Sequence, residues 1–225
     1  MLGDWVIRAR ERARGMYVMR LAYLLTSVGE QRKTFVVHEA ALREFSPFFD
    51  KALTGEWKEA RERVVQLPEE DPEVFDIFVH WVYCGKLPFS IDEHTGDIDA
   101  EYMELAKAYV FGEKLLSPEF QDRVVDVVVE KSRADRNHRH WMESCLGMDV
   151  VRYVYGHTLE GTPLRKLVVD IFFEYGDKTW LDGEIDVPQP FTRALAMHHL
   201  AGRVWDENWV YSSFRYYSAG EFSEF

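Results

Sequence analysis

The sequence has few cysteines, no long apolar run and no excess of basic residues. Cys84 and Cys145 are the two cysteines in 225 residues, too few for a disulfide framework and not spaced as a metal-binding pair. No apolar segment approaches the roughly eighteen residues that a membrane-spanning helix needs, and no Asn-x-Ser/Thr sequon occurs. A net charge of -12 argues against affinity for nucleic acid or anionic membranes, which needs a basic face. These absences favour an intracellular protein of the cytoplasm or nucleus that binds neither nucleic acid nor membrane.

The common enzyme signatures are missing as well. His38-Glu39 begins like a zinc-protease motif, but Leu42 stands where the second histidine is required. There is no Gly-x-Ser-x-Gly elbow, and Gly176–Thr179 lacks the upstream glycine of a phosphate-binding loop. His198 and His199 are adjacent, so on a helix they would point about a hundred degrees apart and could not readily share one metal. We therefore predict a non-enzyme with no catalytic residue, no cofactor and no metal site.

The segment that organises the chain runs from residue 35 to residue 85. Two short β-branched runs, at 35–37 and 64–67, are typical of buried strands. Ser46-Pro47 and Asp71-Pro72 each combine a capping side chain with a first-turn proline, which predicts a helix start at both places. Further helical residues are expected at 39–45, and the helix after Asp71 is apolar on nearly every side until Gly85 can close it. The pattern predicts a compact core that presents a surface.

This segment resembles a BTB (POZ) domain of the type common in fungal proteins. Trp57 stands where many members carry phenylalanine, so an aromatic is kept. The resemblance implies an α+β fold, with a small β-sheet flanked by a helical cluster and followed by an all-helical C-terminal region. It also implies a protein–protein interaction domain that often forms homodimers. The residues that carry it, in the family's order and spacing, are Phe35, His38, Leu42, Ser46, Phe48, Phe49, Leu67, Phe75, Phe78, Tyr83 and Gly85.

Three regions are expected along the chain: an N-terminal arm at 1–20, the BTB/POZ domain at 21–134 and a helical extension at 135–225. The arm holds five arginines and two acids, a charge of +3, so the remaining residues carry -15. A solvated arm and a mitochondrial presequence are both open readings of such a segment. Leu21–Val28 is the expected first strand, and residues 29–33 are the expected hairpin turn, since Gly29 supplies the required backbone freedom.

The connector at 86–99 is rich in acids, glycine and proline, which predicts an exposed loop. In cullin-binding relatives a hydrophobic-x-Glu pattern near this place contributes to the cullin surface, and Ile91-Asp92-Glu93 has that form. With Phe89 beside them, Ile91 and Glu93 are the partner-binding residues that the resemblance implies. A solvated loop with one apolar residue folded back is the alternative.

Helices are expected at 101–116, 118–133, 147–155, 163–175 and 191–204, from apolar spacing and from the Ser117-Pro118 and Thr162-Pro163 starts. The aromatic tail at 205–225 should pack on the helices or on a partner, because a free tail would expose apolar patches.

Two functions fit these observations. The first is a dimerising adaptor that joins a cullin-type ubiquitin ligase to a substrate protein. The second is a non-ligase scaffold or transcription-related regulator that uses the same fold for self-association.

Overall fold

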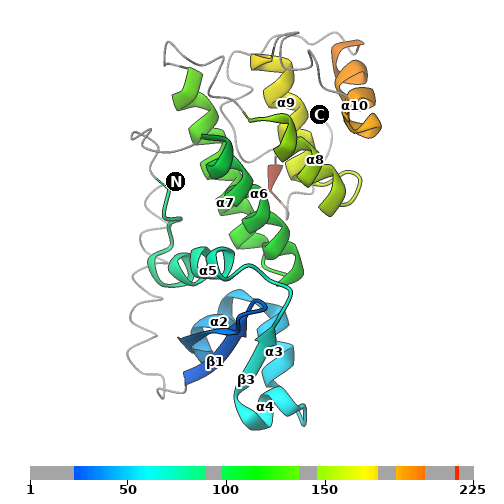
Figure 1. The fold of residues 1–225 in the computed structure, drawn as a ribbon. Helices are drawn as coiled ribbons and strands as arrows, with labels where there is room; N and C mark the ends of the chain where they lie inside the picture. The colour runs from blue at the N-terminus through cyan, green and yellow to red at the C-terminus, as the bar shows by residue number, and fades with distance from the viewer. Residues whose placement is uncertain (1–22, 90–97, 137–145, 177–185, 201–215, 218–225) are drawn as a thin grey trace, which may run out of the picture. The chain divides into compact units, whose positions relative to one another are not determined.

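The computed structural model describes residues 23–89, 98–136, 146–176, 186–200 and 216–217 (Figure 1). The predicted arm lies outside these residues, as does the aromatic tail apart from Tyr216 and Tyr217. The chain divides into two compact units. The first holds the described residues up to Pro88 together with Lys114–Ser117, and the second holds Phe89–Glu113 and the described residues from Pro118 onward.

The first unit contains a three-stranded sheet in the order β2-β1-β3. The central strand β1 (Tyr23–Val28) pairs antiparallel with β2 (Lys33–His38) and parallel with β3 (Val64–Leu67). The hairpin turn needs a glycine, because Gly29 has a φ of 75° and a Cβ there would lie 2.9 Å from Cγ of Pro72. The turn therefore lies where the sequence predicted it. Glycine is required there for its positive φ and also because a side chain would meet Pro72.

Four helices belong to the first unit: α2 (Glu39–Phe45), α3 (Pro47–Leu53), α4 (Lys58–Glu62) and α5 (Pro72–Cys84). The inner face of β1 is fully buried, and α2 packs against β2, α3 and α5. Burial of this apolar surface is the main stabilising term. The largest buried side chains are Leu24, Val28, Leu42, Phe49, Phe75 and Phe78.

The helix starts follow from local capping. The Ser46 hydroxyl accepts the backbone N–H of Phe49 at 3.3 Å. It also donates to the Leu115 carbonyl at 2.7 Å, so the side chain that caps α3 also holds the backbone at Leu115 in place. A carboxylate oxygen of Asp71 accepts the N–H of Glu73 at 2.9 Å. Gly85 ends α5 in the left-handed conformation, with its N–H bonded to Trp81 O at 2.7 Å.

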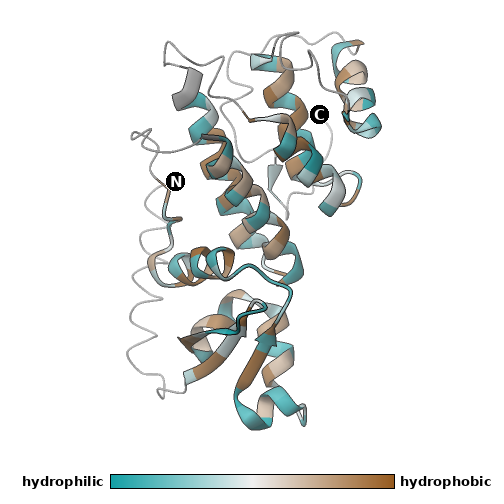
Figure 2. Cartoon of the chain, viewed as in Figure 1, coloured by the Kyte–Doolittle hydropathy of each residue, from teal (hydrophilic) through white to brown (hydrophobic). Residues whose placement is uncertain are grey.

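The second unit is helical over its described residues. It contains α6 (Ile98–Lys114), α7 (Pro118–Arg136), α8 (Met148–His157), α9 (Pro163–Tyr175) and α10 (Gln189–Leu200). Both brown and teal residues occur along α6, α7 and α9 in Figure 2, as expected for helices with a buried and a solvated side. Buried side chains include Leu105, Tyr109, Phe120, Val124, Val151, Leu164, Val168 and Phe191.

Buried polar bonds tie these helices together. The Lys131 ammonium, whose side chain is 3% exposed, pairs with Glu101 at 2.5 Å. The Tyr216 hydroxyl donates to Asp170 of α9 at 2.5 Å, and the Tyr217 hydroxyl donates to Asp126 of α7 at 2.7 Å. The two tyrosines of the aromatic tail that the structure describes are thus bonded to two different helices. For these two residues, packing on the helices is the expectation that applies, rather than packing on a partner.

Candidate protein-interaction surface

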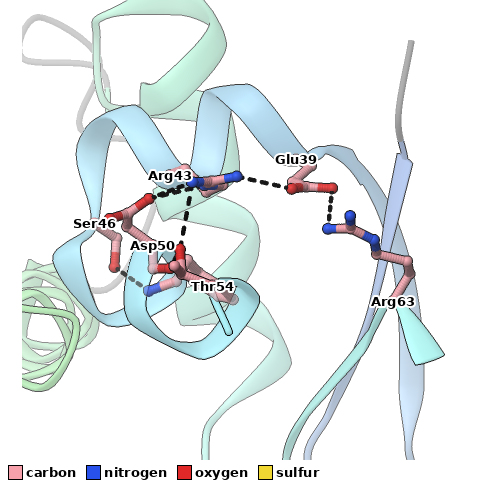
Figure 3. A network of polar contacts seen from close by, with 7 residues as sticks. Glu39, Arg43, Ser46, Asp50, Thr54 and Arg63 are labelled. Atoms are coloured by element: carbon pink, nitrogen blue, oxygen red, sulfur yellow. Dashed lines mark hydrogen bonds and ion pairs between the residues drawn. The ribbon is translucent and has the colours of Figure 1, made fainter. Parts of the chain in front are cut away.

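A network of charged side chains fixes the helices around the α3–β3 connection (Figure 3). Glu39 is buried, with its side chain 8% exposed, and accepts hydrogen bonds from Arg43 at 3.1 Å and from Arg63 at 2.7 Å. Arg43 also donates through Nε to Asp50 at 2.8 Å. The hydrogen bond with Asp50 is the main cause that raises the pKa of Arg43, and Glu39 adds to it. The network joins α2 and α3 to Arg63, directly before β3.

The connection between α3 and β3 therefore has a defined shape rather than a loose one. Arg63 ends α4 with a φ of 56°, and Gly55 precedes the helix with a φ of 94°. Arg61 donates twice to the carbonyl of Glu56, at 2.7 and 3.0 Å, which closes this short helix on its own start. None of the α4 residues is buried.

Trp57 caps the start of α4 and points away from the core. Its side chain is 68% exposed, and among the described residues the indole ring has no hydrogen-bond or ring partner. Tryptophan is costly to leave in water and is enriched among residues that dominate protein interfaces. An exposed tryptophan on a fixed short helix is the arrangement expected of a docking anchor.

The outer face of the sheet is a second exposed apolar area. Cross-strand register places Leu25 opposite Val36 on β2 and next to Val64 on β3, all on the face turned away from the helices. Leu25 is 42% exposed and Val36 is 61% exposed. Tyr23 lies beside them, with its ring 4.8 Å from that of His38. Contiguous exposed apolar side chains of this kind mark interaction sites.

His38 is bonded to the side chain of Tyr83. Its backbone N–H donates to the Tyr83 hydroxyl at 3.0 Å, and its Nδ1 lies 2.7 Å from the same oxygen. The Tyr83 hydroxyl thus bonds both the backbone and the ring of His38. Tyr83 is 45 residues from His38 in the sequence, so this contact joins the end of β2 to the end of α5.

The structure describes one of the three predicted partner-binding residues. Phe89 is half-buried after α5, whereas Ile91 and Glu93 lie outside the described residues. The family-motif residues fall into different environments. Leu42, Ser46, Phe49, Phe75 and Phe78 are buried; Phe35, His38, Phe48 and Leu67 are half-buried; Tyr83 is exposed; and Gly85 is the left-handed cap of α5.

The sequence reasoning missed the exposure of Trp57. It noted only that an aromatic is kept at this family position. The available signal was an aromatic residue set among charged neighbours, in a segment with no apolar spacing to place it in the core.

Within the described ranges, no group of three or more histidine, cysteine, aspartate or glutamate side chains is placed to hold a metal ion. Within the same ranges, none of the helices combines the length and the hydropathy that crossing a bilayer requires.

Comparison with known proteins identifies the family of the first part of the chain. Residues 25–115 match the family model of the BTB/POZ domain, from β1 to the turn after α6. No curated protein matches the chain. BTB/POZ domains are protein–protein interaction modules, and the α+β fold predicted from the sequence is confirmed. Residues 25–115 are thus a BTB/POZ domain, and the chain is a BTB/POZ-domain protein.

Proposed function

We propose that this chain self-associates and docks a cullin-type scaffold, serving inside the cell as a substrate adaptor of a ubiquitin ligase. The observation that carries the proposal is the exposed indole of Trp57, held on a short helix by a defined backbone inside the BTB/POZ domain. A substrate protein would then be recruited by the helical extension at 135–225 or by another chain.

Two segments of the chain have the hydrophobic-x-Glu form that cullin-binding relatives use. The first is Ile91-Asp92-Glu93, with Phe89 beside it. The second is Trp57-Lys58-Glu59, where the aromatic residue is exposed and Glu59 is half-buried at the start of α4. A large aromatic side chain that enters a partner's pocket contributes more binding energy than a rim charge. The geometry therefore favours Trp57 as the anchor, with Ile91 and Glu93 as the alternative contact.

The two segments are separable by paired substitutions. Trp57→Ala/Glu59→Ala and Ile91→Ala/Glu93→Ala are each titrated with the N-terminal region of the cullin from the same source. Leu159→Ala/Glu160→Ala is the matched control, because this pair also combines an exposed apolar residue with an acid, but lies in the second unit. We expect the Trp57 pair to weaken binding at least tenfold, about 1.4 kcal/mol, with an unchanged thermal midpoint. Equal affinity of all three double variants for the cullin would contradict the proposal that either segment binds it.

Self-association is proposed to use the outer face of the sheet. Val36 is the most exposed apolar side chain of that face, so Val36→Asp would place an unpaired charge in the middle of a buried interface. Sedimentation velocity should show a dimer for the wild type and a monomer for Val36→Asp. Thr192→Asp, on exposed α10, is the control that should stay dimeric. A dimer that persists in Val36→Asp would exclude this face.

A non-ligase scaffold or transcription-related regulator is the second candidate. The observation that favours it is the same outer sheet face, since self-association through Leu25 and Val36 requires no cullin. A chain that dimerises through this face and shows no affinity for the cullin would support this candidate over the adaptor.

A further inference from the structure

The second unit contains an open cleft that the BTB/POZ domain does not explain. Its volume is about 620 Å³, within the range of about 300–1,000 Å³ that ligand sites occupy. The cleft is formed by residues of α8, the α8–α9 connection, α9 and α10. Its lining includes Tyr155, Glu160, Lys166, Val169, Ala194 and Met197.

Two of the charged groups in the cleft are already bonded within the protein. Arg165 lies over the Tyr155 ring at 4.6 Å and donates to the Thr158 hydroxyl at 2.9 Å and to the Tyr155 carbonyl at 2.8 Å. Burial raises the pKa of Tyr155, although the nearby Arg165 opposes the shift, so the phenol stays neutral. Asp170 accepts the Tyr216 hydroxyl at 2.5 Å and has His198 at 3.4 Å. These groups form fixed walls and leave little capacity for a ligand.

The lining side chains that remain available to contact a ligand include apolar residues of α10 and the cation Lys166. Met197 is 62% exposed in the lining, and Pro190 and Ala194 continue its stripe along α10. Lys166 is exposed, and its ammonium makes no ion pair or hydrogen bond with another described residue. Exposed methionines are common on surfaces that bind varied peptides, because the side chain adapts its shape. A cleft lined by the exposed Met197 and by a Lys166 ammonium that no described residue pairs fits an apolar side chain next to a carboxylate.

We propose that this cleft binds a linear peptide segment of a partner protein in which an apolar residue lies next to an acidic one. The apolar side chain would pack on Met197 and Ala194, and the carboxylate would pair with Lys166. Glu160, an exposed acid of the α8–α9 connection that also lines the cleft, disfavours a second acid beside it and so restricts how the peptide can bind. A simple anion such as phosphate is disfavoured, since such sites gather several donors and Arg165 is already occupied. The site is independent of cullin binding and provides the second unit with a partner surface of its own.

The test begins with an unbiased probe. Twelve-residue peptides from a random display library are selected on the full chain, and the enriched sequences are synthesised with a fluorescent label. Fluorescence anisotropy then compares their affinity for the wild type with that for Lys166→Glu and Met197→Asp. Lys51→Glu is the matched control, because it reverses the charge of an exposed lysine on α3, in the first unit and outside the Trp57 segment. All three positions are exposed, so circular dichroism should report unchanged folding.

We expect a class of enriched peptides with an apolar residue beside an acid. Their affinity should fall about five- to tenfold in Lys166→Glu and further in Met197→Asp, and should be unchanged in Lys51→Glu. The proposal is overturned if no peptide is enriched, if the enriched peptides lack acids, or if they bind Lys166→Glu and Met197→Asp as well as the wild type.

Discussion

The Ser46→Ala substitution tests how the BTB/POZ core is fastened. Ser46 is fully buried, and its hydroxyl makes two hydrogen bonds: it accepts from Phe49 N–H at 3.3 Å and donates to Leu115 O at 2.7 Å. Alanine removes both. Loss of a serine cap costs about 0.5–2 kcal/mol, and a typical hydrogen bond contributes a net of about 1 kcal/mol.

The cost of losing the hydrogen bond to Leu115 is limited, because a backbone N–H still donates to that carbonyl. The Leu115 carbonyl also accepts the N–H of Phe48 at 3.4 Å, so it is not left without a donor. The orphaned Phe49 N–H sits at a buried helix start, where water cannot easily replace the cap. The expected decrease in the free energy of unfolding is therefore about 2 kcal/mol, the upper part of the capping range plus a fraction of one hydrogen bond.

Urea unfolding followed by far-ultraviolet circular dichroism measures this loss as a lower midpoint with an unchanged slope. Glu44→Ala is the control, because Glu44 is exposed on α2, away from the outer sheet face, and a surface change of this kind should stay within about 0.5 kcal/mol. A Ser46→Ala protein that unfolds within about 0.5 kcal/mol of the wild type would refute the described role of the hydroxyl.

Three further pairs of substitutions test other parts of the structure. Phe78→Ala should cost about 3–5 kcal/mol in urea unfolding because the ring is fully buried, and Phe48→Ala should cost less because its ring is half-buried; equal losses would contradict the burial. Gly29→Ala should cost about 1–3 kcal/mol, since φ is 75° and the new Cβ meets Pro72, whereas Gly156→Ala, with open space around it in α8, should gain about 0.5–1 kcal/mol. Lys131→Met should cost about 1–3 kcal/mol by leaving Glu101 without its cation, and adding Glu101→Gln should restore much of the loss in a double-mutant cycle; additive losses would show that the pair is not coupled.

Local signals in the sequence predicted most helices and strands. Ser46-Pro47 and Asp71-Pro72 predicted α3 and α5 correctly, because a cap and its proline act within one turn of the helix they start. The five-residue helix α4 was missed, since Lys58–Glu62 is charged at every position except Ala60 and has no apolar face to reveal its period. α10 begins at Gln189, two residues before the predicted start, because Pro190 is accepted in its first turn.

Contacts between residues far apart in the chain could not be predicted from the sequence. The parallel pairing of β1 with β3 joins strands separated by three helices, and spacing along the chain carries no record of that pairing. The bonds from Ser46 to Leu115 and from Tyr216 to Asp170 span 69 and 46 residues. The candidate surface has the same origin: an exposed Trp57 follows from how α4 is held, whereas the sequence alone shows only an aromatic residue among charges.

The predicted boundary between domain and extension at residue 134 stays a prediction. The family match ends at residue 115, and the compact units meet at Pro88–Phe89 and around the 114–117 turn. Helices α6 and α7 therefore share a unit with the C-terminal helices over the described residues. A truncated chain ending at residue 134 would lose the bond from Tyr217 to Asp126 and the bond from Gly147 N–H to Asp99 at 3.1 Å.

The adaptor proposal is tested most directly by calorimetric titration of the full chain with the N-terminal region of the cullin from the same source. The account predicts saturable binding at micromolar affinity or tighter, about -8 kcal/mol or more favourable. It also predicts that Trp57→Ala/Glu59→Ala weakens this binding at least tenfold. A chain that is folded by circular dichroism and gives no binding heat at several temperatures would contradict the ligase adaptor and leave the self-associating scaffold.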